Sequence, residues 1–207
     1  MFAVPRGRSG PTLRTVPDIT TLILDDHAWF RRRFADLDEL QARADTDPRE
    51  LSRLWDPLAA RLDVHAIAEE KIFYPQLLEH GEDPEEETLD AIGDHNEIRD
   101  GVARAERNPV GSQEWWAGVW DARRANDEHM AEEENEGLAN FRQHAASGLR
   151  DALGQQFQEF LDAHPTTAGL DNTDKDPETY VERIEERLDP SGPAAGLGIG
   201  SLKGQDQ

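Results

Sequence analysis

Apolar side chains recur at helical spacing along most of the chain, and no stretch shows the alternation expected of a strand. The first apolar stripe predicts a helix over residues 18–44. Its members are Ile23, Phe30, Phe34 and Leu37. A second helix follows Pro48, a residue suited to a first helical turn, and Pro57 is expected to kink or restart it.

Turn-forming residues divide the rest of the chain into further helices. The segment 79–84 predicts a helix end followed by a new start, since Gly81 can cap, Asp83 can serve as N-cap and Pro84 can occupy the first turn. The remaining helices are expected at 84–107, from Ser112 to at least Asn140, at 147–163 and at 177–188.

These elements predict an all-α protein, namely an up-down-up-down four-helix bundle with one or two additional C-terminal helices. The core of the bundle falls at about residues 18–144. The expected organisation is a flexible arm at 1–17, the helical bundle at 18–163, and a linker, short helix and disordered tail at 164–207.

Composition limits what such a bundle can do. With 44 acidic and 22 basic side chains the formal charge is −22, which argues against binding nucleic acid. The absence of cysteine rules out disulfides, thiolate metal sites and cysteine nucleophiles. No apolar run is long enough to span a bilayer, and the start of the chain lacks the apolar segment of a signal peptide, so we expect a cytoplasmic protein without membrane contact.

One motif pair is repeated along the chain. HxxxEE occurs at His65 with Glu69 and again at His129 with Glu133, and each copy is preceded by DHxxxR. The histidines of these two DHxxxR motifs are His27 and His95, which stand 38 and 34 residues before the next histidine. Residues four apart share one face of a helix, so each HxxxE presents an imidazole and a carboxylate in the same direction.

Imidazole nitrogens and carboxylate oxygens together suit iron, manganese or zinc. Six such ligands are too many for one ion that keeps a reactive position, so we expect two ions, with coordination positions left for a bridging oxygen and for dioxygen, peroxide or nitric oxide. A cation would also explain why acids stand on an apolar stripe. The expected ligands are His27 and His65 for one ion, His95 and His129 for the other, and Glu69 and Glu133 as bridges.

The same residue types have simpler explanations when taken singly. A lone histidine in a helical core is usually structural, and one HxxxE motif in an acidic chain is a weak signal, so the hypothesis depends on the repeat. Three further glutamates are expected to face solvent or to support the ligands rather than to bind metal: Glu70, Glu132 and Glu134. Other residues with a possible role are Asp26 and Asp94, which could orient imidazoles, and Tyr74 and Tyr180, for which packing is favoured.

The order H, HxxxE, H, HxxxE over about residues 18–163 resembles the hemerythrin-like family, also called the HHE cation-binding domain. The tract IFYP at 72–75 is also typical of that family. The resemblance implies a carboxylate-bridged, usually oxo-bridged, di-iron centre held by the six residues above, with zinc or manganese as possible substitutes. Oxygen-carrying members have a histidine four residues after the third-helix histidine, where this chain has Arg99, so a more open site is expected.

Three functions follow as alternatives. The first is chemistry on hydrogen peroxide or nitric oxide in stress defence, which would make the protein an enzyme. The second is sensing, binding or storing oxygen or iron without turnover. The third is a helical interaction protein with no metal. A monomer or weak homo-oligomer is expected in each case.

Overall fold

The computed structural model describes residues 16–43 and 45–189, and the regular elements of this part of the chain are helical. The elements are α1 (Ile19–Gln41), α2 (Pro48–Ala68), the π-helical segment η1 (Glu69–Phe73), α3 (Tyr74–His80), α4 (Glu85–Glu106), α5 (Gln113–Asn135), α6 (Gly137–His144), α7 (Ser147–Ala163) and α8 (Pro177–Leu188). The predicted all-α fold is confirmed. The predicted arm up to residue 15 and the tail from residue 190 lie outside the described residues.

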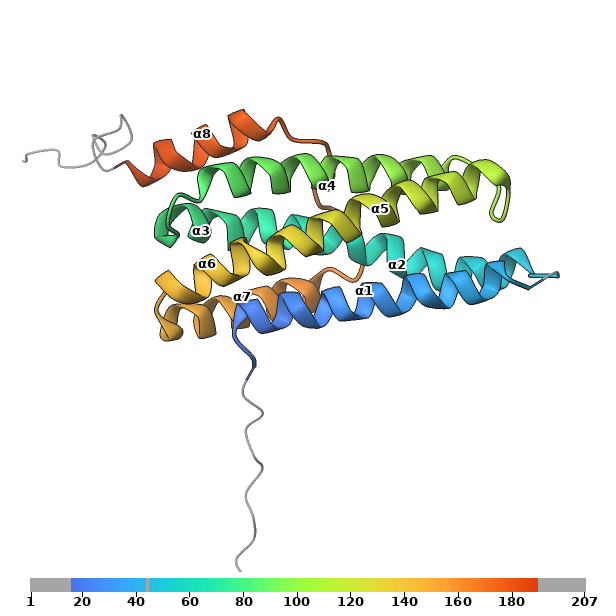
Figure 1. Ribbon diagram of the computed structural model, residues 1–207, viewed down its shortest axis with the longest axis horizontal. Coiled ribbons are helices and arrows are strands. Elements are labelled where there is room, and N and C mark those ends of the chain that lie inside the picture. Colours follow the sequence, from blue (N-terminus) through green and yellow to red (C-terminus); the bar gives the residue numbers. More distant parts are fainter. Residues whose placement is uncertain (1–15, 44, 190–207) are drawn as a thin grey trace, which may run out of the picture.

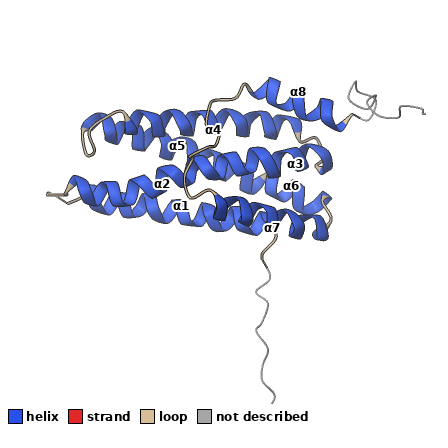
Figure 2. Ribbon diagram, turned by 180° about the vertical axis from the view of Figure 1, so that it is seen from behind, coloured by secondary structure: helices blue, strands red, loops and turns tan. Residues whose placement is uncertain are grey.

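Four antiparallel rods form the bundle, and Figure 1 shows them running alternately in opposite directions. The rods are α1, then α2 with η1 and α3, then α4, then α5 with α6. Helix α7 packs against α1 and α2, and α8 packs against α4 and α3. Figure 2 shows the segment after α7 crossing the bundle to reach α8. These are the additional C-terminal helices that the sequence predicts.

Two apolar clusters fill the bundle, one toward each end. The cluster near α6, α7 and α8 includes Ile23 and Ile92, and the cluster at the other end includes Phe30 and Ile98. His27 lies between Ile23 and Phe30 along α1, and His95 lies between Ile92 and Ile98 along α4. The histidines therefore occupy a polar layer between the two apolar clusters.

Helices α4 and α5 approach each other unusually closely, because two glycines lie at their contact. A methyl group on Gly101 would collide with the backbone of Ala122, and one on Gly118 would collide with the backbone of Ala105. Only glycine allows backbones to pass this near. The close contact thus joins the two helices that carry His95 and His129.

Two predicted details need correction, one within the second rod and one at the start of the third. Helix α2 continues through Pro57 without a break. Pro57 removes a hydrogen bond to the carbonyl of Arg53, but both residues are exposed, so water can satisfy that carbonyl. Asp83 is not an N-cap: it adopts a left-handed conformation with φ 48°, and Pro84 stands at the N-cap position of α4 instead of in its first turn.

The fourth rod is also less regular than predicted. The expected helix from Ser112 to Asn140 is interrupted at Glu136, whose backbone angles are φ −114° and ψ −78°. Glycine is a poor helix former, and Gly137 follows this residue. The hydrogen bond from the Asn140 N–H to the Glu136 carbonyl, 2.8 Å, keeps α6 in line with α5.

In the segment η1, the helical turn that follows Ala68 contains one residue more than an α-helical turn. The N–H of Tyr74 donates to the carbonyl of Glu69, a step of five residues instead of four. Consecutive glutamates, Glu69 and Glu70, are both buried at this point. Glu69 faces the interior of the bundle, and Glu70 faces α4 and the segment that leads to α8.

No helix among the described residues combines the length and the apolar character needed to cross a membrane.

Candidate metal centre

The six residues predicted as ligands come from all four rods and meet in the polar layer. Each is almost completely buried, from 0% exposed for Glu69 to 5% for Glu133. Buried ionisable side chains need partners, since an isolated charge in an apolar interior is costly. The six residues are His27, His65, Glu69, His95, His129 and Glu133.

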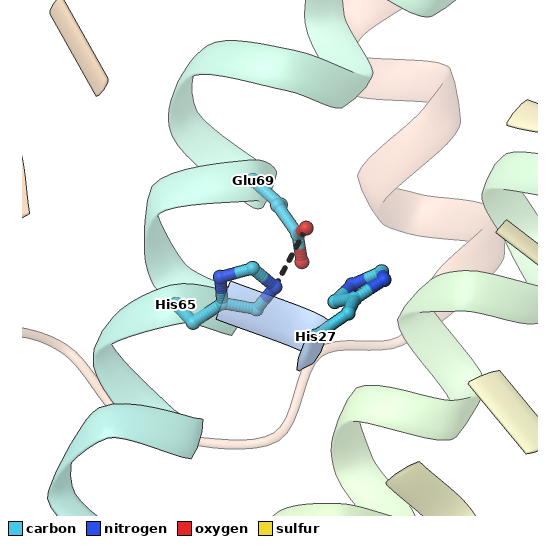
Figure 3. Close-up of side chains that lie close together, drawn as sticks. All are labelled: His27, His65 and Glu69. Atoms are coloured by element: carbon cyan, nitrogen blue, oxygen red, sulfur yellow. Dashed lines mark ion pairs between the residues drawn. The ribbon is translucent and has the colours of Figure 1, made fainter. Parts of the chain in front are cut away.

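The first group combines His27 from α1 with His65 and Glu69 from the second rod (Figure 3). One potential ligand atom from each residue lies within 4.8 Å of the other two. Nε2 of His65 is 2.9 Å from Oε1 of Glu69. Figure 3 shows the His65 and Glu69 side chains extending from adjacent turns toward each other, with the His27 ring facing them from the next helix.

The second group combines Glu69 with His95 of α4 and His129 of α5. Oε2 of Glu69 lies 3.3 Å from Nε2 of His95 and 3.9 Å from Nε2 of His129. The two imidazole Nε2 atoms are 3.3 Å apart. Glu69 thus presents one oxygen to each group, which is the arrangement required of a carboxylate shared by two ions.

Glu133 stands on the other side of the layer. Its Oε2 lies 3.3 Å from Nε2 of His27, and its Oε1 accepts a hydrogen bond of 2.9 Å from the Tyr74 hydroxyl. The structure therefore brings Glu133 to the same site, but with one oxygen held by a tyrosine. Its role as a second bridge stays a prediction.

Each histidine turns its Nε2 inward and its Nδ1 toward an outer carboxylate. Nδ1 of His27 is 2.9 Å from Glu134, and Nδ1 of His65 is 3.0 Å from Asp26. For the other two the outer carboxylates are Glu70, 3.0 Å from His95, and Asp94, 3.6 Å from His129. A carboxylate behind a ligating imidazole fixes its orientation and its tautomer.

Basic side chains neutralise three of these four outer carboxylates. Arg61 pairs with Asp26 at 2.8 Å, and Arg31 pairs with Glu134 at 2.8 Å. The third, Glu70, pairs with Arg99 and, at 2.9 Å, with Lys175. Arg99 thus binds the carboxylate that also contacts Nδ1 of His95.

The electrostatics of the site call for positive charge. Burial disfavours a charged imidazole, yet the Glu69 and Asp26 carboxylates outweigh it and raise the pKa of His65 to about 10. Burial likewise opposes ionisation of Glu69, but His65 and His95 lower the pKa of that carboxyl well below its usual value. Without a metal, protons must supply the compensating charge. A divalent cation can take their place, and metal binding at such sites releases protons.

The hydrogen bonding of the site supports a metal as well. Within the described part of the chain, several buried atoms that face the layer have no hydrogen-bond partner. They are Nε2 of His27 and of His65, both carboxylate oxygens of Glu69, and Oε2 of Glu133. Buried polar atoms in native proteins are rarely left unpaired. Nitrogen and oxygen donors that converge in this way fit a pair of first-row metal ions.

Other residues singled out from the sequence take structural places. Glu132 is exposed, whereas Glu70 and Glu134 support histidines, and both roles were among the expected alternatives. The Tyr180 hydroxyl donates to the backbone carbonyl of Glu70 at 2.6 Å. Which outer acid contacts which histidine was not predicted. The second glutamate of each HxxxEE motif could have indicated two of these contacts, because Glu70 contacts His95 and Glu134 contacts His27.

The comparisons with known proteins agree with this geometry. The family model described as the hemerythrin HHE cation binding domain matches residues 18–141, more than half of the chain. Searches of curated proteins and of solved structures returned no match. The match ends within α6, so the expected extension of the domain to residue 163 stays a prediction. The matched range contains all six candidate ligands, and the chain belongs to the hemerythrin HHE cation-binding domain family.

Proposed function

We propose that the protein holds two iron ions in the polar layer and uses them to bind or react with dioxygen, hydrogen peroxide or nitric oxide in cytoplasmic stress defence. The proposed ligands are His27, His65, Glu69, His95, His129 and Glu133. Zinc or manganese could occupy the same donors, because nitrogen and oxygen ligands do not select strongly among these metals.

The position of Glu69 carries the proposal. It is fully buried, its Oε1 lies 2.9 Å from Nε2 of His65, and its Oε2 lies 3.3 Å from Nε2 of His95 and 3.9 Å from Nε2 of His129. Glu69 belongs to both groups of candidate ligands, and one ion would leave the imidazoles of the other group without a metal. Two ions satisfy both oxygens at once.

When bound, the iron pair supplies the redox and Lewis-acid chemistry that the amino-acid side chains lack. The protein residues hold the imidazoles in position through their Nδ1 contacts, and two apolar clusters pack on either side of the layer. Tyr74 donates a hydrogen bond to one oxygen of Glu133 and so fixes the orientation of that carboxylate. Because Arg99 pairs with Glu70 instead of facing the layer, six protein ligands serve two ions, and positions stay open for a small ligand.

The direct test is metal content and the visible spectrum after anaerobic loading with ferrous iron. We expect about two irons per chain, with near-ultraviolet and visible bands that change on adding azide, peroxide or nitric oxide. His129→Ala should lose much of the metal. A matched control is His144→Ala, which changes a histidine on α6 outside the site.

Failure to bind iron by a folded protein would contradict the proposal, as would equal metal loss in both variants. Turnover is a separate measurement. Peroxide or nitric oxide consumption by the loaded protein must exceed that of the same amount of free iron for a catalytic role to stand.

A sensing role without turnover is the alternative, and one observation favours it. The segment between α7 and α8 reaches the site, because Lys175 and Arg99 both pair with Glu70, whose other contact is His95. A change at the metal could therefore alter the packing of α8. Hydrogen exchange of residues 165–188 should then differ between iron-loaded protein with and without nitric oxide, and identical exchange would exclude this alternative.

A further inference from the structure

A pocket opens between α4, α5 and α6 and leads to the metal centre. It is narrow, with a cavity volume of about 30 Å³. His129 and Glu133 form its inner end together with Tyr74. The pocket therefore joins two of the proposed ligands to solvent.

The inner end holds a polar group that points to a ligand. Oε1 of Glu133 is held by Tyr74, but Oε2 accepts no hydrogen bond from the described residues, and the side chain is 3% exposed. A buried carboxylate oxygen left in this way calls for a cation or a donor. This observation is independent of the charges at the mouth.

The wall of the pocket is strongly acidic. Its lining includes five carboxylates besides Glu133, and no lysine or arginine. They are Glu87, Asp90, Asp94, Glu132 and Glu136. An adjoining hollow shares three of these residues and adds Glu97, Asp176 and Glu178 at its rim. Partial burial and the nearby Glu136 carboxylate raise the pKa of Glu87, as expected where acids crowd together.

Asp94 differs from the other three outer carboxylates in its ion pairing. Asp26, Glu134 and Glu70 stand behind histidines and each pairs with an arginine or a lysine. Asp94 stands behind His129 but lies in the pocket, and among the described residues it has no such partner. The five carboxylates of the wall likewise form no ion pair with lysine or arginine in the described part of the chain. Among the outer carboxylates within the described residues, the one without a lysine or arginine partner is thus Asp94, which lines the pocket.

We propose that this pocket is the route by which divalent cations, ferrous iron above all, reach and leave the metal centre. This inference rests on the proposed function, and it adds the route by which the metal reaches the centre and the preference of that route for cations. A cleft lined by one sign of charge concentrates ions of the opposite sign and accelerates their association. The same wall repels anions and leaves the approach of neutral peroxide, dioxygen and nitric oxide unchanged. Iron complexed by an anionic chelator should therefore be a poor donor.

The test is the rate of metal uptake by the full chain, followed by stopped flow with cobalt(II) as a redox-inert probe and with ferrous iron under anaerobic conditions. The variant Asp90→Asn, Glu132→Gln, Glu136→Gln removes three wall charges and no proposed ligand. The control Glu39→Gln, Asp151→Asn, Glu159→Gln removes three exposed charges on α1 and α7. Both triple variants have the same net charge, so a general effect of the −22 charge cancels.

We expect uptake by the wall variant to be about tenfold slower than uptake by the control at low ionic strength, with a weaker dependence on salt. The final metal content should be the same in both. Azide, an anion, should react faster with the loaded wall variant, whereas hydrogen peroxide should react at an unchanged rate. If the triple variant does not fold, Glu132→Gln alone should show the same changes to a smaller degree.

Equal uptake rates and equal salt dependence in the wall and control variants would overturn the proposed route. Failure of the unmodified protein to bind metal would instead overturn the proposed function. If both variants bound the full amount of metal at equal rates, the proposed metal centre would be supported and only the pocket as its entry route would be contradicted.

Discussion

The carboxylate of Glu70 lies 3.0 Å from Nδ1 of His95 and also pairs with Arg99 and Lys175. One buried acid thus joins a proposed metal ligand to the segment that precedes α8. The backbone of the same residue accepts a hydrogen bond from Tyr180 of α8. The C-terminal addition therefore forms part of the support of the metal centre.

Glu70→Gln is expected to weaken metal binding by about 10- to 100-fold, because loss of a carboxylate behind a ligating histidine typically has that effect. The variant should also be less stable by a few kcal/mol, of order 3–5, since Arg99 is 4% exposed and would lose its charged partner. Competition with a chelator measures the first effect, and denaturant unfolding of the metal-free protein measures the second.

The control for this change is Glu79→Gln, which alters an exposed glutamate on α3. It should leave both the affinity and the free energy of unfolding unchanged. Metal affinity of Glu70→Gln equal to that of Glu79→Gln would show that Glu70 does not support His95.

Two glycines of the same helix should respond in opposite ways to alanine. At Gly101 the added methyl would collide with the backbone of Ala122, so α4 and α5 must separate. At Gly93 no atom lies within 4 Å of the added methyl. Gly101→Ala is expected to destabilise the protein by about 1–3 kcal/mol, and Gly93→Ala to stabilise it by up to about 1 kcal/mol.

Thermal or denaturant unfolding of the metal-free proteins measures both changes. Gly101→Ala should in addition weaken metal binding, because the spacing of α4 and α5 affects the 3.3 Å distance between Nε2 of His95 and Nε2 of His129. A stable Gly101→Ala protein with unchanged metal affinity would mean that the close approach of the helices does not matter to the site.

The sequence predicted the bundle and the assembly of the six residues because both depend on one periodicity. His27 stands four residues after Ile23 and three before Phe30, so burying the apolar stripe also buries the imidazole. The same argument applies to the other three rods. When the apolar stripes of four helices pack together, the side chains that lie on those stripes point toward one another.

The support of the site could not be read from the same pattern. Burial of Glu70 depends on the π-helical step at 69–73 and on the cover provided by Lys175 and Tyr180. The spacing of apolar residues does not reveal the five-residue hydrogen-bond step of a π-helix. Residues 164–176 show no periodicity that would predict which part of the bundle they contact. The interruption at Glu136 and the left-handed Asp83 are equally local choices that the stripe does not determine.

Asp18 provides a test of stability against pH that is independent of the metal. It is the N-cap of α1 and accepts hydrogen bonds from the backbone N–H groups of Thr20 at 3.0 Å and Thr21 at 3.2 Å. Burial opposes its ionisation, but the hydrogen bonds from Thr20 and Thr21 and the charge of Arg150 outweigh this effect. The pKa of Asp18 is therefore lowered from its usual 3.8.

A lowered pKa in the folded state means that the ionised group stabilises the protein above pH 3.8, and that this contribution is lost as the pH falls through the folded-state pKa. Asp18→Asn keeps a capping oxygen without the charge, so it should be slightly less stable than the unmodified protein at pH 7, and the difference should shrink as the pH falls below 3.8. Asp18→Ala should lose about 1 kcal/mol at pH 7 because the cap itself is gone. Urea unfolding of the three metal-free proteins at several pH values measures these differences, and a gap between Asp18→Asn and the unmodified protein that stayed constant as the pH fell would contradict the assignment of a charged N-cap.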